Sequence, residues 1–233
     1  MVVAARAQQH WWFVVIAAAA LLMVTMGARQ SLGLFVSPLN TATGLGIVSI
    51  SFALAVGQFI WGAIQPIAGA AADRYGPGRV LAAGVLVMAA GLAATPFIDS
   101  GFGLTLALGF LMAAGAGAAS FSVLIGAAAQ SVPAAARGTA SGVINAGGSF
   151  GQFVFAPLVQ KLIGLSGVLG LLWLALISLV ALPLAWLLRR SPEAAAAQQA
   201  ASAADGGLRK AVAGALRDRS YLLLHAGFFT CGF

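Results

Sequence analysis

Six apolar stretches, each long enough to cross a lipid bilayer, follow one another along the first 190 residues of this chain. We place them at residues 12–38, 47–72, 80–97, 102–129, 139–163 and 168–188. About 20 apolar residues span the hydrocarbon core as a helix, and a helix satisfies its own backbone hydrogen bonds in lipid. With 61% hydrophobic and 7% charged residues, the chain is predicted to be an all-α polytopic membrane protein.

A seventh apolar stretch follows a polar segment. Residues 191–219 are rich in alanine and polar side chains, and we expect them to form a cytoplasmic linker. Residues 220–233 are almost wholly apolar, but a helix of that length rises only about 20 Å. The sequence therefore predicts a six-helix transmembrane bundle over residues 1–190 and the start of a truncated seventh transmembrane helix over residues 220–233.

Positive charges are distributed unevenly between the two sides of this predicted bundle. With the N-terminus inside, the cytoplasmic segments hold Arg6, Arg74, Arg79, Arg137, Arg189, Arg190, Arg209, Lys210, Arg217 and Arg219. The outer side holds at most Lys161. This asymmetry predicts a multi-pass integral protein of the inner (plasma) membrane with a cytoplasmic N-terminus. It also accounts for the net charge of +7, so no nucleic acid partner is expected.

A short charged loop joins the second and third apolar stretches. Its sequence, GAAADRYGPGR, places an acidic residue at the end of one span, then a glycine turn, then a basic residue; the positions are Gly69, Asp73, Arg74, Gly76 and Arg79. An ordinary positively charged loop is the alternative interpretation. The pattern resembles the loop signature G-x-x-x-D-R-x-G-x-[RK]-[RK] of the major facilitator superfamily (MFS), although Pro77 and Gly78 leave its basic end with one arginine.

That resemblance implies the N-terminal half of an MFS transporter, in which this loop is a conformational latch between two six-helix halves. In that role Gly69 allows close helix contact and Asp73 meets a helix terminus of the second half. Arg74 and Arg79 hold the loop, and Gly76 makes the turn. The missing C-terminal six-helix half is then an expected partner, together with the lipid bilayer.

The fifth stretch is rich in small residues and contains a proline. Gly142, Gly147 and Gly151 are expected to permit close helix packing, and Pro157 is expected to kink or loosen the helix. The pattern R-x-x-A-x-G-x-x-x-A-G-x-x-x-G with a later Pro-Leu is similar to the monocarboxylate-porter and oxalate:formate-antiporter branches of the superfamily. The first stretch lacks the acidic-glycine-aromatic signature of many monocarboxylate carriers, and the fourth lacks the arginine usual in drug/proton antiporters.

Arg29 is the only full charge well inside a predicted span. A buried arginine in lipid is costly and usually faces a cavity or a partner. It could hold a carboxylate through a bidentate, charge-assisted contact. Alternatively, it reaches the outer headgroups or caps backbone carbonyls.

Uncharged polar side chains accompany Arg29 in the predicted interior. Asn145 and Gln152 in the fifth stretch and Ser120 in the fourth are candidates for substrate contact. Gln58 and Gln65 in the second stretch share one helix face, where amides hold helices together more often than they bind ligands.

No catalytic, cofactor-binding or metal-binding pattern occurs, so no enzyme activity, cofactor or metal is expected. The resemblance implies secondary active transport of a small organic anion, such as a mono- or dicarboxylate, by proton symport or anion exchange. Efflux of a drug-like compound by the same superfamily is one alternative. A non-transporting truncated fragment, or a half-transporter that needs a partner chain, is another.

Overall fold

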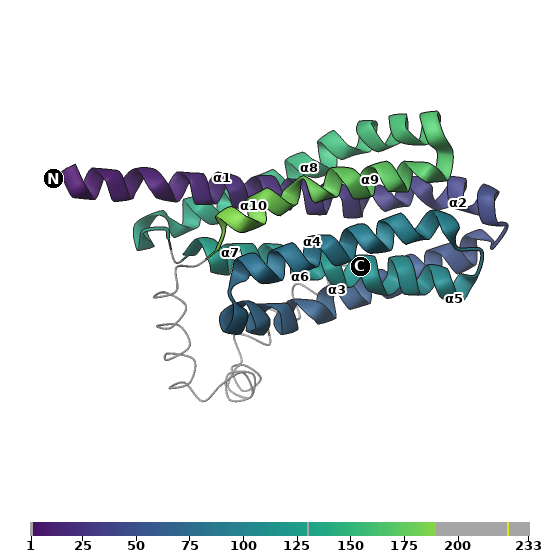
Figure 1. Ribbon diagram of the computed structural model, residues 1–233, viewed down its shortest axis with the longest axis horizontal. Helices are drawn as coiled ribbons and strands as arrows, with labels where there is room; N and C mark the ends of the chain where they lie inside the picture. Colours follow the sequence, from purple (N-terminus) through teal and green to yellow (C-terminus); the bar gives the residue numbers. More distant parts are fainter. Residues whose placement is uncertain (1, 130, 190–222, 224–233) are drawn as a thin grey trace. The chain divides into compact units, whose positions relative to one another are not determined.

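The computed structural model describes residues 2–129, 131–189 and 223. The elements are α1 (Val2–Gln30), η1 (Ser31–Phe35), α2 (Val36–Thr43), α3 (Ile47–Tyr75), α4 (Pro77–Ala94), η2 (Thr95–Phe97), α5 (Gly101–Leu104), η3 (Thr105–Met112), α6 (Ala113–Ala118), α7 (Phe121–Ala129), η4 (Ala134–Ala136), α8 (Arg137–Ser166), η5 (Gly167–Leu169), α9 (Gly170–Leu179) and α10 (Ala181–Leu187) (Figure 1). Every regular element in the described part is helical, which confirms the all-α prediction there. The predicted linker 191–219, and all of residues 220–233 except Leu223, lie outside the described residues.

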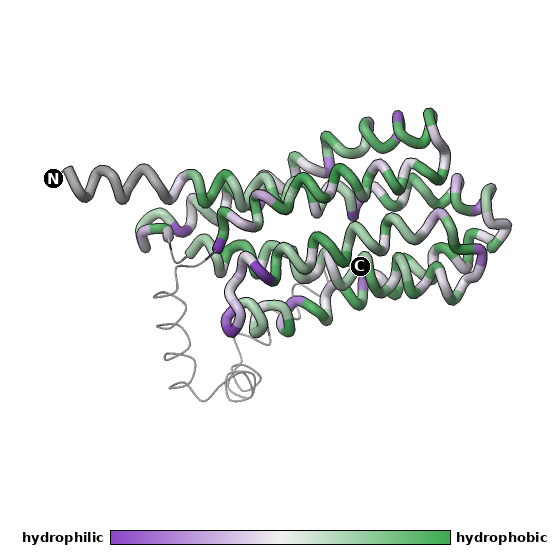
Figure 2. Tube along the Cα trace, viewed as in Figure 1, coloured by the Kyte–Doolittle hydropathy of each residue, from purple (hydrophilic) through white to green (hydrophobic). Residues whose placement is uncertain are grey.

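Five helical segments are long and apolar enough to cross a membrane. They are Trp11–Thr43, Ile47–Tyr75, Pro77–Phe97, Gly101–Ala129 and Ala134–Leu187, and apolar residues follow them over most of their length (Figure 2). The last has 54 residues, which as one straight helix would extend about 80 Å. The chain turns instead at Gly167, where φ is 58°. Beyond this turn α9 runs back beside α8 (Figure 1).

The first segment continues further than the sequence pattern predicts. We expected its span to end at Pro38 and a loop to follow, but α2 runs from Val36 to Thr43. Pro38 lies in the first turn of α2, where its missing N–H would have no helical acceptor. Helical structure ends at Gly44, which adopts a φ of 66°. Arg29 lies near the middle of this 33-residue segment.

Helices α1 and α8 approach each other closely along glycines. A Cβ added at Gly147 would lie 2.5 Å from the Ala19 carbonyl oxygen, and one at Gly151 would overlap the Met23 carbonyl oxygen. Gly142 differs, since a Cβ there would meet nothing within 4 Å in the described structure. Nine residues separate Gly142 from Gly151, about two and a half turns, so the two lie on opposite sides of α8.

A second glycine-dependent interface lets η3 and α6 pack closely against both α3 and α4. A Cβ at Gly109 would lie 2.8 Å from the Ala53 carbonyl oxygen, and one at Gly117 would lie 2.8 Å from the Trp61 carbonyl oxygen, both on α3. A Cβ at Gly115 would lie 2.5 Å from the carbonyl oxygen of Gly84 on α4. This packing fixes the Trp61 backbone directly against α6.

Candidate functional site

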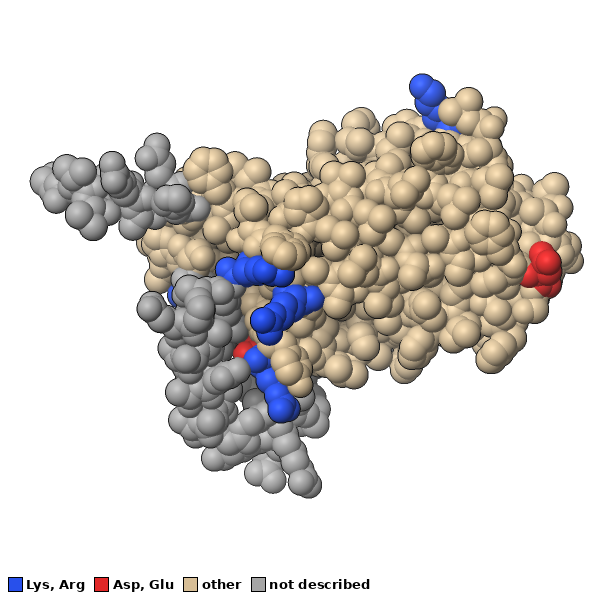
Figure 3. Space-filling model, in the orientation of Figure 1, with Lys and Arg blue, Asp and Glu red and all other residues tan. Residues whose placement is uncertain are grey.

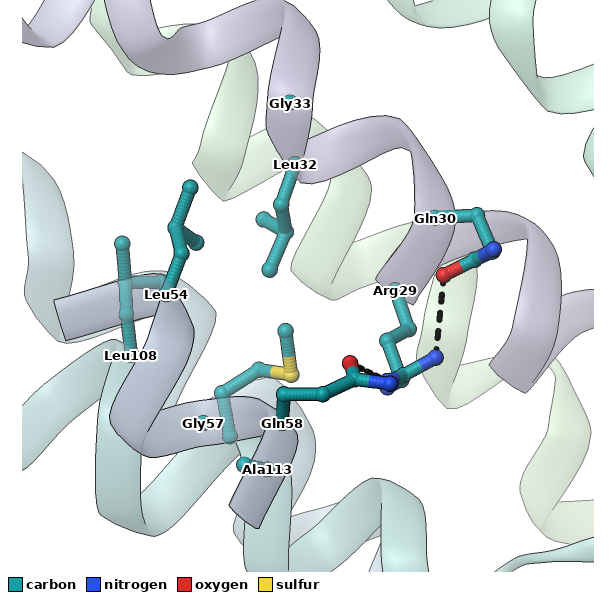
Figure 4. A pocket seen from close by; sticks show the side chains of 10 residues that line it. Arg29, Gln30, Leu32, Gly33, Leu54, Gly57, Gln58, Leu108 and Ala113 are labelled. Atoms are coloured by element: carbon teal, nitrogen blue, oxygen red, sulfur yellow. Dashed lines mark hydrogen bonds between the residues drawn. The ribbon is translucent and has the colours of Figure 1, made fainter. Parts of the chain in front are cut away.

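A small cavity lies beside Arg29, between three parts of the bundle. Its volume is about 170 Å³, and the end of α1 with η1, the middle of α3, and η3 with α6 line it (Figure 4). Arg29, Gln30 and Gln58 supply its polar side chains, and the remaining lining residues are leucine, glycine, methionine and alanine. The cavity thus combines an apolar wall with a single charged group.

The Arg29 guanidinium is held by three neutral neighbours. Its Nη1 donates to Gln30 Oε1 at 2.9 Å, and its Nη2 donates to Gln58 Oε1 (Figure 4). Its Cζ lies 4.1 Å from the centroid of the Trp61 ring, a cation–π contact. Gln58 and Trp61 are three residues apart on α3 and therefore share one helix face. The side chain thus lies against α3, near the middle of that helix.

No carboxylate among the described residues neutralises this cation. The described residues include two carboxylates, Asp73 in the last turn of α3 and Asp99 between η2 and α5, and neither pairs with Arg29. On the face shown in Figure 3, the charged side chains of the described residues lie toward the two ends of the bundle. Within this part of the chain, no group of three or more His, Cys, Asp or Glu could hold a metal ion. The positive charge therefore has only dipolar and aromatic partners there.

The other predicted substrate residues do not line the Arg29 cavity. Ser120 lies at the break between α6 and α7, is 1% exposed, and its Oγ has no hydrogen-bond partner within the described residues. Asn145 is exposed and Gln152 half-buried, both on α8. Pro157 is exposed within α8, which continues through it.

Two residues of the Arg29 site, Trp61 and Gln30, are not among the sequence-derived candidates. Trp61 follows Gln58 by about one helical turn, so Trp61 lies on the same face of the second apolar stretch as the predicted amides Gln58 and Gln65. The Trp61 Nε1 atom has no hydrogen-bond acceptor in the part of the chain that the structure describes. The other amide on this face, Gln65, accepts a hydrogen bond from Ser122 Oγ at 2.8 Å and so joins α3 to α7.

The charged loop is a turn of one residue. Gly76 alone separates α3 from α4 and adopts a φ of 89°, a region that glycine enters readily. Asp73, Arg74 and Arg79 are exposed around it. Gly69 has open space beside it, since a Cβ there would meet nothing within 4 Å.

The next glycine of this loop explains why its basic end is short. Gly78 is buried, and a Cβ there would lie 2.8 Å from the Ala185 carbonyl oxygen and 2.6 Å from Cγ of Arg189. The end of α10 therefore occupies the space that a side chain at position 78 would need. Arg189 itself stacks on Trp186, with Cζ 3.4 Å from the ring centroid.

Among models of known protein families, one described as Major Facilitator Superfamily matches residues 12–233. No curated protein shows significant similarity to the chain. The matched region takes in nearly all of the described bundle, including the Arg29 cavity and the one-residue turn at Gly76. The apolar helical segments make this an integral, multi-pass membrane protein, and the chain belongs to the major facilitator superfamily of transporters.

Proposed function

We propose that this protein is a secondary active transporter of a small organic anion, such as a mono- or dicarboxylate, and that Arg29 binds the anion. The observation that carries the proposal is the Arg29 charge, which lies in a mid-span cavity with only neutral partners among the described residues. A carboxylate would supply the missing counter-charge and could engage the guanidinium through two hydrogen bonds. In a site of low dielectric constant such a contact is far stronger than in water.

The cavity of about 170 Å³ is one wall of the proposed site, which a C-terminal half would complete. The monocarboxylate-porter or oxalate:formate-antiporter branch is proposed from the charge of Arg29 and the residue pattern of α8, and drug efflux by the same superfamily is the alternative. Proton symport and anion exchange are both compatible with one arginine as the anion-binding group.

We propose that this site belongs to a carrier made of two six-helix halves. The N-terminus is cytoplasmic, the membrane is the inner (plasma) membrane, and α8 and α9–α10 cross it separately, which makes six passes over residues 1–190. A C-terminal six-helix half completes the substrate site, and access alternates between the two sides of the membrane. Asn145, Gln152 and Ser120 are proposed as further substrate contacts. The latch between the halves comprises Gly69, Asp73, Arg74, Gly76 and Arg79.

Uptake by the reconstituted protein tests this function. Radiolabelled lactate and oxalate are offered to proteoliposomes that contain the wild type, Arg29→Gln or Arg29→Lys. We expect Arg29→Gln to abolish uptake and Arg29→Lys to retain a small part, because lysine keeps the charge but loses the planar fork. Lys161→Gln, which removes an exposed positive charge from α8, is the matched control and should transport normally.

Unchanged carboxylate uptake by Arg29→Gln would contradict the assignment of Arg29. Transport of a lipophilic dye by the wild type, insensitive to Arg29→Gln and without carboxylate uptake, would establish the efflux alternative instead.

A further inference from the structure

We propose that Gln58 occupies the position of a substrate carboxylate oxygen on Arg29 when the site is empty, and that an arriving carboxylate displaces it. This inference rests on the proposed function and adds a residue that lowers affinity in the wild type.

The hydrogen bonds of the Arg29 guanidinium show how Gln58 could compete with a carboxylate. Both of its terminal nitrogens already donate to oxygens, Nη1 to Gln30 Oε1 and Nη2 to Gln58 Oε1, and the two amides approach from different elements (Figure 4). A bidentate carboxylate presents two oxygens to two N–H groups of the same fork. The two neutral oxygens occupy two of the five N–H donors of the guanidinium, one on each terminal nitrogen, and a carboxylate that uses these two N–H groups must displace them.

The exchange favours an anion over a neutral ligand. A carboxylate oxygen carries a full negative charge whereas an amide oxygen carries only part of a dipole, so the Coulomb attraction of the guanidinium is stronger for the carboxylate. Gln30 and Gln58 are both exposed, so a displaced amide can form new hydrogen bonds with water in the cavity. A neutral ligand would replace one dipolar oxygen with another and gain little. The Gln58 oxygen therefore competes more effectively with neutral ligands than with anions for the Arg29 guanidinium.

Trp61 keeps Arg29 in place when Gln58 leaves. Its ring lies 4.1 Å from the Arg29 Cζ, so the plane of the guanidinium is supported independently of either amide. The Trp61 carbonyl is itself packed against Gly117 of α6, at 2.8 Å from the position of an added Cβ. Removal of the Gln58 amide should therefore leave a formed anion site behind.

The Arg29–Gln58 bond is also one of the links between α1 and α3, whose backbones approach each other at few points. Its displacement leaves the contact between Arg29 and the Trp61 ring in place, so the two helices stay linked at this level.

Substitution of Gln58 tests this in the purified full chain, with oxalate binding measured by titration calorimetry. Gln58→Leu removes the competing oxygen at similar volume, and we expect it to bind oxalate about three- to tenfold more tightly, the equivalent of one modest hydrogen bond. Gln58→Glu tethers a carboxylate beside Arg29 and should weaken oxalate binding by at least about tenfold at pH 7.

Gln65→Leu is the matched control, because Gln65 is on the same helix but bonds to Ser122, so its oxalate affinity should equal that of the wild type. Weaker or unchanged binding by Gln58→Leu, with Arg29→Gln inactive, would overturn the displacement and leave the proposed function intact. Absence of binding by both the wild type and Gln58→Leu would overturn the two together. Binding that appears only in Gln58→Leu would support the displacement, with Gln58 as a stronger competitor than we expect.

Discussion

The α1–α8 interface offers a sharp test of the packing, through the replacement of Gly147 by alanine. The added Cβ would lie 2.5 Å from the Ala19 carbonyl oxygen, whereas ordinary van der Waals contact begins at 3.4 Å. The two helices must therefore separate by about 1 Å, and a gap of that size forfeits about a quarter to a half of the dispersion energy of the atoms along the interface.

Overfilling a packed interface in this way costs about 1–3 kcal/mol. We expect Gly147→Ala to lower the free energy of unfolding by that amount, measured in mixed micelles by SDS titration and far-UV circular dichroism. Gly142→Ala is the matched control on the same helix, since its Cβ would meet nothing within 4 Å. It should be neutral or stabilising by about 0.5–1 kcal/mol, because alanine favours a helix more than glycine does.

Gly147→Ala is thus expected to lower the free energy of unfolding, and Gly142→Ala is not. Equal stability of Gly147→Ala and Gly142→Ala would refute the close approach of α1 and α8 on which this reasoning depends.

Two further substitutions test other parts of the structure. Trp61→Leu removes the aromatic ring that contacts Arg29. It should weaken oxalate binding about threefold or more, because a cation–π contact contributes about 0.5–2 kcal/mol. Trp173→Leu, on the exposed surface of α9, is the control, and an equal loss of affinity in both variants would contradict a specific role of Trp61. Gly78→Arg, which makes the loop conform better to the family signature, should lower stability by about 1–3 kcal/mol, because its side chain would meet the Ala185 carbonyl. A fully stable Gly78→Arg protein in thermal unfolding would show that α10 does not pack there.

The positions of the apolar helices were predictable because apolar length alone determines them. The end of the first span was not, because proline is compatible with the first turn of a helix and α2 continues from Val36 to Thr43. The predicted span of residues 12–38 already placed Arg29 well inside the helix, and the longer segment puts it near the middle.

The residues that contact Arg29 could not be predicted from the sequence. A charge within an apolar stretch is visible in the sequence, but its contact with Trp61 depends on how far α3 is rotated and shifted relative to α1. Helical periodicity fixes neither quantity. The same limit applies to α8, where the spacing of small residues grouped Gly142 with Gly147 and Gly151, although only the latter two meet α1.

On the proposed function, the charge of Arg29 would also make one step of the transport cycle sensitive to membrane voltage. Moving one elementary charge through 100 mV changes the free energy by about 2.3 kcal/mol. With a monocarboxylate bound, Arg29 and its ligand together would be neutral, so reorientation of the loaded site would depend little on voltage. The empty site would keep its positive charge, and a negative interior would oppose its return to the outside. On this proposal, a membrane potential would slow net uptake more than it slows exchange of one anion for another.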